Sequence, residues 1–461
     1  PNTTLARNAY LDQLVIESFD VRAWVTVSQD CSTQKIIHDL LITSMKEMNT
    51  NIFGQSDEEK MYKSLKGRRY LIVMDDMWNT KAWDDVRGIF PDDDNGNVAF
   101  YVDSSSELHE MCFMDEDESW NLLRQKVFGN QDCPSELEDI GKKIAKGCGG
   151  LPLAIVVIGG LLRTLSKTQA SWRQIAENVN SIVATQDGEF EEVLSLSYTH
   201  LPHHLRPCFL YMGGFPEDYE IHVSKLIRLW VAEGYLETNV CERTEEMAEE
   251  YFVDLVKRSL VLATSWKSNG KIKTCSMHDL MRDLCVRKSH EAKFLLYTVD
   301  RDPLKVVSQS INNKGRSLVI DNSDLNSLVK KYGSNIRTII CVRSIANSLG
   351  PLGNLRFLRV LDMVKTRSLP SLPPELFDEL VLLRYLALDY AVSILTAISN
   401  LSNLQSLIIL SCSYLPLNIW KMPQLRHLVS SSVDVVKNPL ETSYVLENLQ
   451  TLFGLSNFIC T

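Results

Sequence analysis

The run KGRRYLIVMDDMW, residues 66–78, contains the clearest strand pattern of the sequence. A basic turn precedes an apolar run, and two carboxylates, Asp75 and Asp76, follow it directly. Continuous apolar runs of this length are typical of strands covered on both faces of a parallel sheet. Such sheets bind ligands at the carboxyl ends of their strands. The run therefore predicts Asp75 and Asp76 at a ligand-binding edge, although a strand that simply ends in a polar turn has the same pattern.

Helical and strand-like patterns alternate around this run. Residues 19–28, FDVRAWVTVS, are rich in β-branched and aromatic residues and predict a second buried strand. Residues 32–45 have apolar side chains at helical spacing, with Ser32 at the expected cap. Helices that alternate with apolar strands indicate a parallel α/β sheet. We therefore expect an α/β parallel-sheet domain over residues 1–115.

Composition describes an ordinary globular chain. It has 461 residues, which suggests about three or more domains, with 45% hydrophobic and 23% charged residues. The net charge of -10 argues against nucleic acid or anionic lipid as a general partner. The eleven cysteines include no CxxC pair, which favours reduced thiols over a disulfide framework. The longest apolar run, residues 150–162, is shorter than the roughly 20 residues that span a bilayer.

The first residues read like the tail of a phosphate-binding loop. TTLA, residues 3–6, supplies the hydroxyls of Thr3 and Thr4. Pro1 and Asn2 occupy the positions of the Gly and Lys that such a loop uses to surround and neutralise phosphates. Alone, a Thr at a helix start is more often a cap. We expect an incomplete phosphate loop of the P-loop NTPase type, in a domain truncated at its N-terminus.

The middle of the chain has a helical pattern. Residues 116–200 predict a helical domain in which Gly149, Gly150 and Pro152 separate two helices, although Pro152 could simply begin a helix. Residues 201–300 combine short helices with one or two strands, the pattern of a winged helix. Within it, His278 and Asp279 fall at a helix start, where composition alone assigns no function.

A repeat occupies residues 301–461. LxxLxL frames begin at Ile336, Leu358, Leu383, Leu404 and, more weakly, Leu425. Their spacing of 21 to 25 residues matches leucine-rich repeats, in which each frame is one short strand of a solenoid. The sequence therefore predicts a leucine-rich-repeat solenoid that is truncated at Thr461.

Taken in order, six motifs resemble those of one protein family. They are FDVRAWVTVSQ (19–29), RRYLIVMDDMW (68–78), DESWNLLRQKVFG (117–129), GCGGLPLAI (147–155), CFLYMGGFPEDYEI (208–221) and MHDLMRDL (277–284). Together with the repeats, they are similar to plant intracellular immune receptors, the coiled-coil-type nucleotide-binding leucine-rich-repeat proteins. The resemblance covers nearly the whole chain and is strongest to the late blight resistance group of the nightshade family.

The resemblance implies a switch in defence against pathogens rather than a metabolic enzyme, with at most very slow ATP hydrolysis. ADP would hold the nucleotide-binding, ARC1 (116–200) and ARC2 (201–300) domains closed. Exchange for ATP would lead to assembly and hypersensitive cell death. By position in the motifs, Thr3 and Asp75 would meet Mg²⁺, with Thr3 and Thr4 near phosphate. Asp76 would orient water, Pro152 would pack on adenine, and His278 would reach the β-phosphate of ADP.

The resemblance also implies partners. The repeats would recognise a pathogen effector or a host guard protein and would contribute autoinhibition, in a cytoplasmic protein that is at most peripheral to membranes. Self-oligomerisation or a helper receptor would complete the signal, and no nucleic acid is expected.

Two departures from the family pattern leave alternatives open. The Gly and Lys of the phosphate loop are missing, and only NVAFY (97–101) stands where the family has a strand ending in Thr-Thr-Arg. Either an edge of the sheet should therefore be shortened, or NVAFYV (97–102) should stand in for the lost strand. A partial or degenerate copy that binds nucleotide weakly and acts as a protein-binding decoy is one alternative. A winged-helix regulator that binds DNA through the basic segment 267–288 is another.

Overall fold

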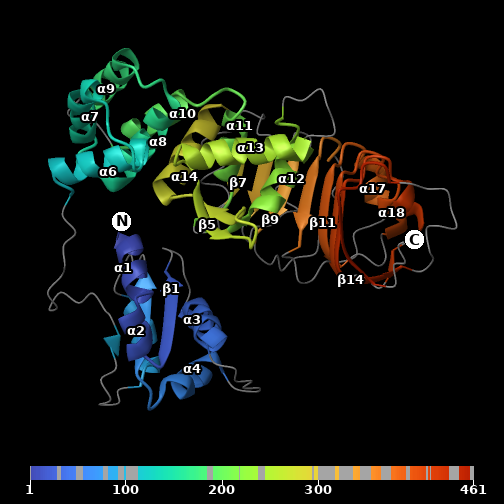
Figure 1. The fold of residues 1–461 in the computed structure, drawn as a ribbon. Coiled ribbons are helices and arrows are strands. Elements are labelled where there is room, and N and C mark those ends of the chain that lie inside the picture. Colours follow the sequence, from blue (N-terminus) through green and yellow to red (C-terminus); the bar gives the residue numbers. More distant parts are fainter. Residues whose placement is uncertain are drawn as a thin grey trace. The chain divides into compact units, whose positions relative to one another are not determined.

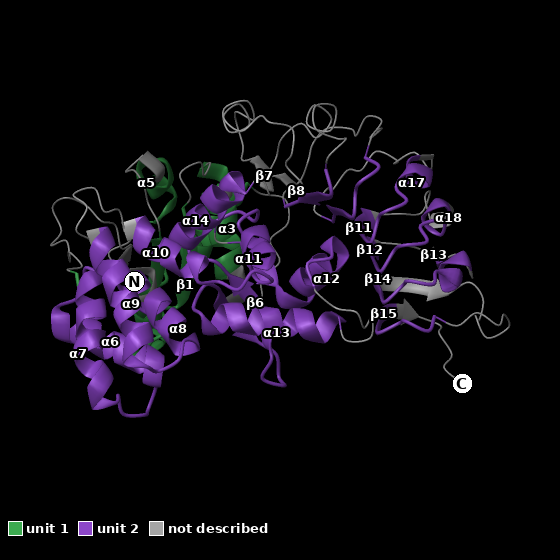
Figure 2. Ribbon diagram, turned by 90° about the horizontal axis from the view of Figure 1, so that it is seen from above, with its two compact units in different colours: residues 1–113 green, residues 114–461 purple. Residues whose placement is uncertain are grey.

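A computed structural model gives the fold in two compact units, residues 1–113 and 114–461 (Figures 1 and 2). Each unit is described by itself. The structure describes residues 2–27, 33–47, 56–75, 81–91, 98–99, 113–183, 190–217, 219–236, 244–292, 295–298, 317–320, 336–342, 355–364, 375–390, 395–411, 414–415, 417–435 and 446–456. Within these residues, no helix is both long enough and apolar enough to cross a membrane.

The first unit has the predicted parallel sheet. Its strands are β1 (Val21–Thr26), β2 (Tyr70–Asp75) and β3 (Val98–Ala99), in the order β1-β2-β3. Strands β1 and β2 pair in parallel along their whole length, from Val21 with Tyr70 to Thr26 with Asp75. The described helices of the unit are α1 (Asn2–Tyr10), α2 (Gln13–Ser18), α3 (Thr33–Glu47), α4 (Asp57–Leu65) and α5 (Lys81–Val86), with the 3-10 turn η1 (Arg87–Ile89).

Helices cover both faces of β1 (Figure 1). Its alternate residues, including Val21 and Ala23, are fully buried in a core with α3 and α4. On the other face, the Arg22 guanidinium donates to the Tyr10 carbonyl over 2.8 Å, and the Trp24 ring meets the Tyr10 ring edge-on. The two-sided covering predicted from the apolar strands is therefore confirmed.

The third strand lies in the segment that the sequence offers in place of the lost strand, whereas the shortened edge stays a prediction because the residues on both sides of β3 fall outside the described ranges. Strand β3 is two residues long, lies within the predicted NVAFY segment and pairs through Leu71 with Val98. Asp76 and Ser32 fall outside the described residues, as do most residues around β3.

The second unit begins with the predicted helices. They are α6 (Glu116–Phe128), α7 (Ser135–Gly147), α8 (Pro152–Thr164), α9 (Gln169–Val183) and α10 (Phe190–Thr199). Asp115 and Glu118 form a capping box at the start of α6. Gly149 and Gly150 have φ values of 63° and 70°, a conformation that favours glycine, and they separate α7 from α8 where the sequence predicts the break.

Short helices and a small antiparallel sheet follow, as the winged-helix pattern predicts. The helices are α11 (Arg206–Met212), α12 (Val223–Glu233), α13 (Thr244–Lys257) and α14 (Asp279–Glu291). The strands β4 (Ile221–His222), β5 (Leu262–Trp266) and β6 (Ile272–Ser276) have the order β4-β6-β5.

The rest of the second unit is a ladder of parallel strands. It comprises β7 (Leu295–Thr298), β8 (Ser317–Ile320), β9 (Thr338–Cys341), β10 (Val360–Met363), β11 (Tyr385–Tyr390), β12 (Ser406–Ser411), β13 (Tyr414–Leu415), β14 (His427–Val435) and β15 (Thr451–Ser456). Short helical turns lie between some of these strands: α17 (Glu375–Glu379), α18 (Leu395–Ile398) and the 3-10 turn η4 (Leu417–Lys421).

The five predicted frames stack in register along this ladder. Ile339 pairs with Leu361, Leu361 with Leu386, Leu386 with Leu407, and Leu407 with Leu428. The apolar residues at the leucine positions of the frames belong to one buried core. A further frame at Leu449 and Leu452 continues onto β15, where Leu428 pairs with Leu452.

The opposite face of the ladder packs against the winged-helix region. Alternate strand residues such as Ile340, Val360 and Tyr385 join one core with α12 and with the fully buried Trp230 of that helix. Helix α12 lies along β10 and β11 (Figure 1). The predicted division at residues 300 and 301 stays a prediction, but the two regions share this core.

Candidate functional site

The predicted nucleotide residues of the first unit lie at the starts and ends of elements. Thr3 and Thr4 are in the first turn of α1. Asp75 is the last residue of β2, is partly buried, and its carbonyl accepts from Val27 over 2.8 Å. The carboxylate therefore stands at the carboxyl end of a parallel strand, the edge where such sheets bind ligands.

Hard oxygen donors of this kind are what Mg²⁺ prefers. Among the residues that the structure describes, no three His, Cys, Asp or Glu side chains gather as a metal site. A magnesium ion held by Asp75 and Thr3 would also take water and phosphate oxygens as ligands, as nucleotide-bound Mg²⁺ usually does.

Pro152 is the first residue of α8, directly after the two glycines with positive φ. A proline fits this position because its ring sets the helical φ and the missing N–H would have no helical partner. The ring is partly exposed, whereas most of α8 behind it, from Ala154 to Leu162, is buried. Pro152 thus presents an apolar surface on a rigid helix, which suits packing against a flat ring.

His278 is the N-cap residue of α14, and its side chain is 28% exposed. Its Nδ1 lies beside the Asp279 carboxylate, and the contact with His278 holds the pKa of Asp279 below its usual value. Imidazole at a helix N-terminus is well suited to an anion, because the helix dipole adds partial positive charge there.

Arg282 fixes the helix that carries His278. Its guanidinium, 8% exposed, donates from Nε to the Phe215 carbonyl over 2.7 Å. This bond ties α14 to the GGFPE segment (213–217), and its two residues lie 67 positions apart in the sequence. We did not predict a role for Arg282; its position one turn after His278 was the available signal.

The predicted site residues divide between the units. Thr3, Thr4 and Asp75 belong to the first, and Pro152 and His278 to the second. That they form one nucleotide site stays a prediction.

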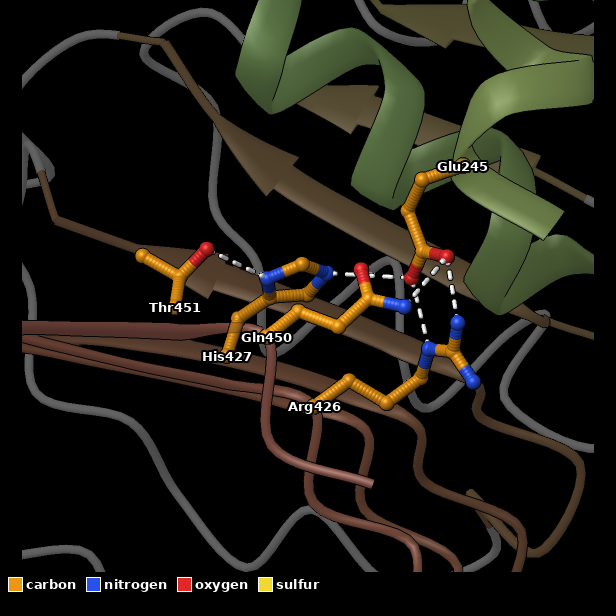
Figure 3. A network of polar contacts seen from close by, with 5 residues as sticks. All are labelled: Glu245, Arg426, His427, Gln450 and Thr451. Carbon is orange, nitrogen blue, oxygen red and sulfur yellow. Dashed lines mark hydrogen bonds and ion pairs between the residues drawn. The ribbon is translucent and has the colours of Figure 1, made fainter. Parts of the chain in front are cut away.

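A second polar cluster joins the winged-helix region to the ladder (Figure 3). At its centre is Glu245 in the first turn of α13. Arg426 binds this carboxylate with two nitrogens, its Nε lying 2.6 Å from Oε1. His427 Nε2 and Gln450 Nε2 approach the same carboxylate at 3.1 and 3.2 Å. Since His427 Nδ1 lies 3.1 Å from the Thr451 hydroxyl, a neutral imidazole that donates to Glu245 and accepts from Thr451 satisfies both contacts.

The cluster is largely removed from water. The side chains of Arg426, His427 and Glu245 are 3%, 7% and 16% exposed. Burial alone would raise the pKa of Glu245, but the hydrogen bonds from His427 and Arg426 outweigh it and lower the pKa to about 2. Burial also lowers the pKa of His427, which favours its neutral form.

Two further polar contacts bridge the same regions. Lys225 of α12 pairs with Asp362 of β10 over 2.6 Å, and the Asp362 side chain is 1% exposed. The attraction of Asp362 outweighs burial and raises the pKa of Lys225. Nearby, Glu233 of α12 accepts from the Thr338 hydroxyl, and its carbonyl accepts from Arg359. We call these contacts and the Glu245 cluster together the polar latch.

Sequence reasoning did not predict the polar latch. Its partners are separated by more than one hundred residues, as in the pair of Glu245 and Arg426, 181 residues apart. Local patterns carry no signal for such a pair. The one available signal was Asp362, an acid inside an otherwise apolar strand.

Known protein families match two parts of the chain. Residues 2–133 match the NB-ARC domain, and residues 215–285 match the disease resistance protein winged helix domain. The chain is 35% identical to the late blight resistance protein R1-A of Solanum demissum and to two homologs of late blight resistance proteins, R1B-16 and R1B-23, from the same plant. Each similarity covers 98% of this chain but only 36% to 38% of the relative, so the chain spans a little over a third of the relatives' length.

Proposed function

Because the chain belongs to the NB-ARC disease resistance proteins, we propose that it acts in plant defence as a receptor switched by exchange of ADP for ATP. In this proposal it is a binding switch with at most very slow hydrolysis. The observation that carries it is the position of His278, a partly exposed imidazole at the N-terminus of a helix that Arg282 holds in place.

Each predicted residue then has a role. Thr3 and Thr4 meet phosphate at the start of α1, and Thr3 and Asp75 hold Mg²⁺, which supplies positive charge to the phosphates. Pro152 packs its ring against adenine. His278 donates to the β-phosphate, and Asp76 orients a water molecule. If His278 contacts ADP only in the closed arrangement, ADP binds that arrangement more tightly than the open one. This difference in ADP affinity shifts the equilibrium toward the closed arrangement.

We further propose that the ladder is a leucine-rich-repeat solenoid. The support is the recurrence of one strand per 21 to 25 residues, with the frame leucines stacked in a shared core. In this role the repeats recognise a pathogen effector or a host guard protein, and release leads to oligomerisation and cell death.

The polar latch supports a second role for the repeats, autoinhibition. It ties α12 and the start of α13 to strands β9, β10 and β14 through buried polar contacts. An interface that combines an apolar core with a few charged pairs can have two discrete arrangements, since breaking one pair weakens the others. The latch is thus suited to hold the winged helix closed until the repeats bind a ligand.

Calorimetric titration with ADP and ATP tests the switch. We expect ADP binding that weakens by about tenfold or more in His278→Ala and in Asp75→Ala, because each change removes a charge-assisted contact to the nucleotide or its metal. The matched control is His38→Ala, whose imidazole is 60% exposed and pairs with Asp57 on the surface. Equal ADP affinity in all four proteins, or no binding to the unmodified chain, would contradict the proposal.

A further inference from the structure

Arginines line up along one edge of the ladder. The second residue of each frame, directly after its first apolar residue, is Arg337, Arg359, Arg384, Gln405, Arg426 and Gln450 in successive frames. The backbone joins these residues one to the next: each N–H from Arg359 onward donates to the carbonyl of the preceding member, over 2.6 to 2.8 Å. Neighbouring members are therefore about 4.8 Å apart, the spacing of paired strands. We call these six positions the arginine stripe.

The described partners of the arginine stripe carry negative charge or the negative end of a dipole. Arg359 donates to the Glu233 carbonyl in the last turn of α12, where the helix dipole places partial negative charge. Arg426 and Gln450 bind the Glu245 carboxylate. At Arg359, Arg426 and Gln450 the stripe therefore binds acceptors of the winged-helix region, which occupies this part of it.

The Glu245 end of the stripe is preformed by the repeats. The backbone positions of Arg426, His427 and Gln450 are set by the pairing of β12, β14 and β15 and by the backbone bonds of the stripe. Only the carboxylate comes from the winged-helix region. If α13 moves away, the cradle loses its anion but keeps its donors in place. A ligand carboxylate can then replace Glu245 at little ordering cost, since preorganised donors lose little freedom on binding.

Apolar surface adjoins the cradle. Phe453 is 65% exposed, lies two residues after Thr451 on the same face of β15, and pairs in register with Val429. A binder that fits both features has an acidic residue close to an apolar one. The net charge of -10 favours a short acidic peptide over nucleic acid, because the chain as a whole repels a polyanion more strongly than a segment with few charges.

We propose that the arginine stripe is the docking site for an acidic peptide segment of a partner protein, which takes the place of Glu245 and so releases α13. The opening of the latch rests on the switch proposed above, whereas the binding of an acidic segment depends only on the cradle. The ligand carboxylate and Glu245 then compete for the same hydrogen-bond donors, so binding of the ligand also releases autoinhibition.

A labelled hexaglutamate peptide tests the competition by fluorescence anisotropy against the full chain. Glu245→Gln weakens the internal competitor and leaves the cradle intact, so this variant should bind hexaglutamate about tenfold tighter than the unmodified chain. Glu249→Gln is the matched control. Glu249 lies one turn later on α13 and pairs with Lys271 on the surface, so its affinity should equal that of the unmodified chain. The double variant Glu245→Gln with Arg426→Gln should lose the gain.

Three outcomes would overturn the proposal: equal affinity of Glu245→Gln and Glu249→Gln, a gain that survives in the double variant, or equal binding of a labelled hexaglutamine. A gain of the same size with a short duplex DNA would overturn the assignment to a peptide. The melting temperature of each variant shows whether it is folded. When Arg426→Lys, which keeps the charge, is combined with Glu245→Gln, the folded protein should retain part of the gain in hexaglutamate affinity. Failure of ADP binding in the same preparations would refute the switch and leave the peptide result standing.

Discussion

Replacing Glu245 by Gln should destabilise the second unit at neutral pH and have little effect in acid. The pKa of Glu245 is about 2 in the folded chain, against 4.5 for an ordinary glutamate. Each unit of pKa difference corresponds to about 1.4 kcal/mol, so the full shift represents about 3 kcal/mol. Some solvent reaches this side chain, which is 16% exposed, and we therefore expect about 2–3 kcal/mol.

The direction with pH follows from the lowered pKa. Above pH 4.5 Glu245 is ionised in both states, and its full contribution to stability is present. As the pH falls from 4.5 toward 2, the unfolded chain takes up a proton before the folded chain does, and the contribution is lost. By about pH 3 more than half of it should be gone.

Urea unfolding followed by tryptophan fluorescence measures this effect. The midpoints of the unmodified chain and of Glu245→Gln should differ clearly at pH 7 and converge toward pH 3. Glu249→Gln removes only a surface pair with Lys271, whose side chain is 57% exposed, and should change the free energy of unfolding by less than about 1 kcal/mol. A difference between the Glu245→Gln and unmodified chains that stays constant from pH 7 to pH 3 would refute the reasoning.

Two other substitutions test the packing of the second unit. Gly160→Ala should destabilise it by about 1–3 kcal/mol in thermal unfolding, because the added methyl would overlap the Arg258 backbone carbonyl at the end of α13. The control Gly88→Ala has open space around the added methyl and should change stability by less than about 1 kcal/mol. Asp362→Asn should cost about 3 kcal/mol in urea unfolding, because it leaves Lys225 without its anion, whereas Glu379→Gln on an exposed helical turn should change stability by less than about 0.5 kcal/mol. A neutral Gly160→Ala or Asp362→Asn would contradict the packing described above.

The polar latch shows why charged pairs inside an interface are poor targets for sequence reasoning. Removing one partner of such a pair destabilises the fold, because the other charge stays buried without a counter-ion. This penalty depends on burial and not on the neighbouring residues in the sequence, so the sequence does not mark which charges are paired. Glu245 resembles any acid in the first turn of a helix, and Arg426 resembles any basic residue between two leucines. Only the contact between them distinguishes them.

The predicted nucleotide residues were partly accessible from sequence. Asp75 ends β2, Pro152 begins α8 and His278 precedes α14, all at the element boundaries that the motifs indicate. Boundaries of this kind depend on local chemistry, such as an apolar run that ends or a proline without an N–H. Their joint role in one site depends on distances across the chain, and it stays a prediction.

The sequence by itself determined the elements and their stacking. The LxxLxL frames recur every 21 to 25 residues, and this spacing predicts one short strand per repeat, stacked in parallel on the next, so the frames from Ile336 to Leu425 already indicated the ladder. The frame at Leu449 and strands β7 and β8 were not predicted from the sequence.

Tertiary structure alone decided what covers the other face of the ladder. Side chains alternate along each strand, so the residues between the frame leucines face away from the core of the ladder. Their apolar members, Ile340 and Val360, meet α12, and their polar neighbours in the frames, Arg426 and His427, meet Glu245. Burial of these residues follows from contact with helices more than one hundred residues earlier in the chain, and a local pattern cannot specify such partners.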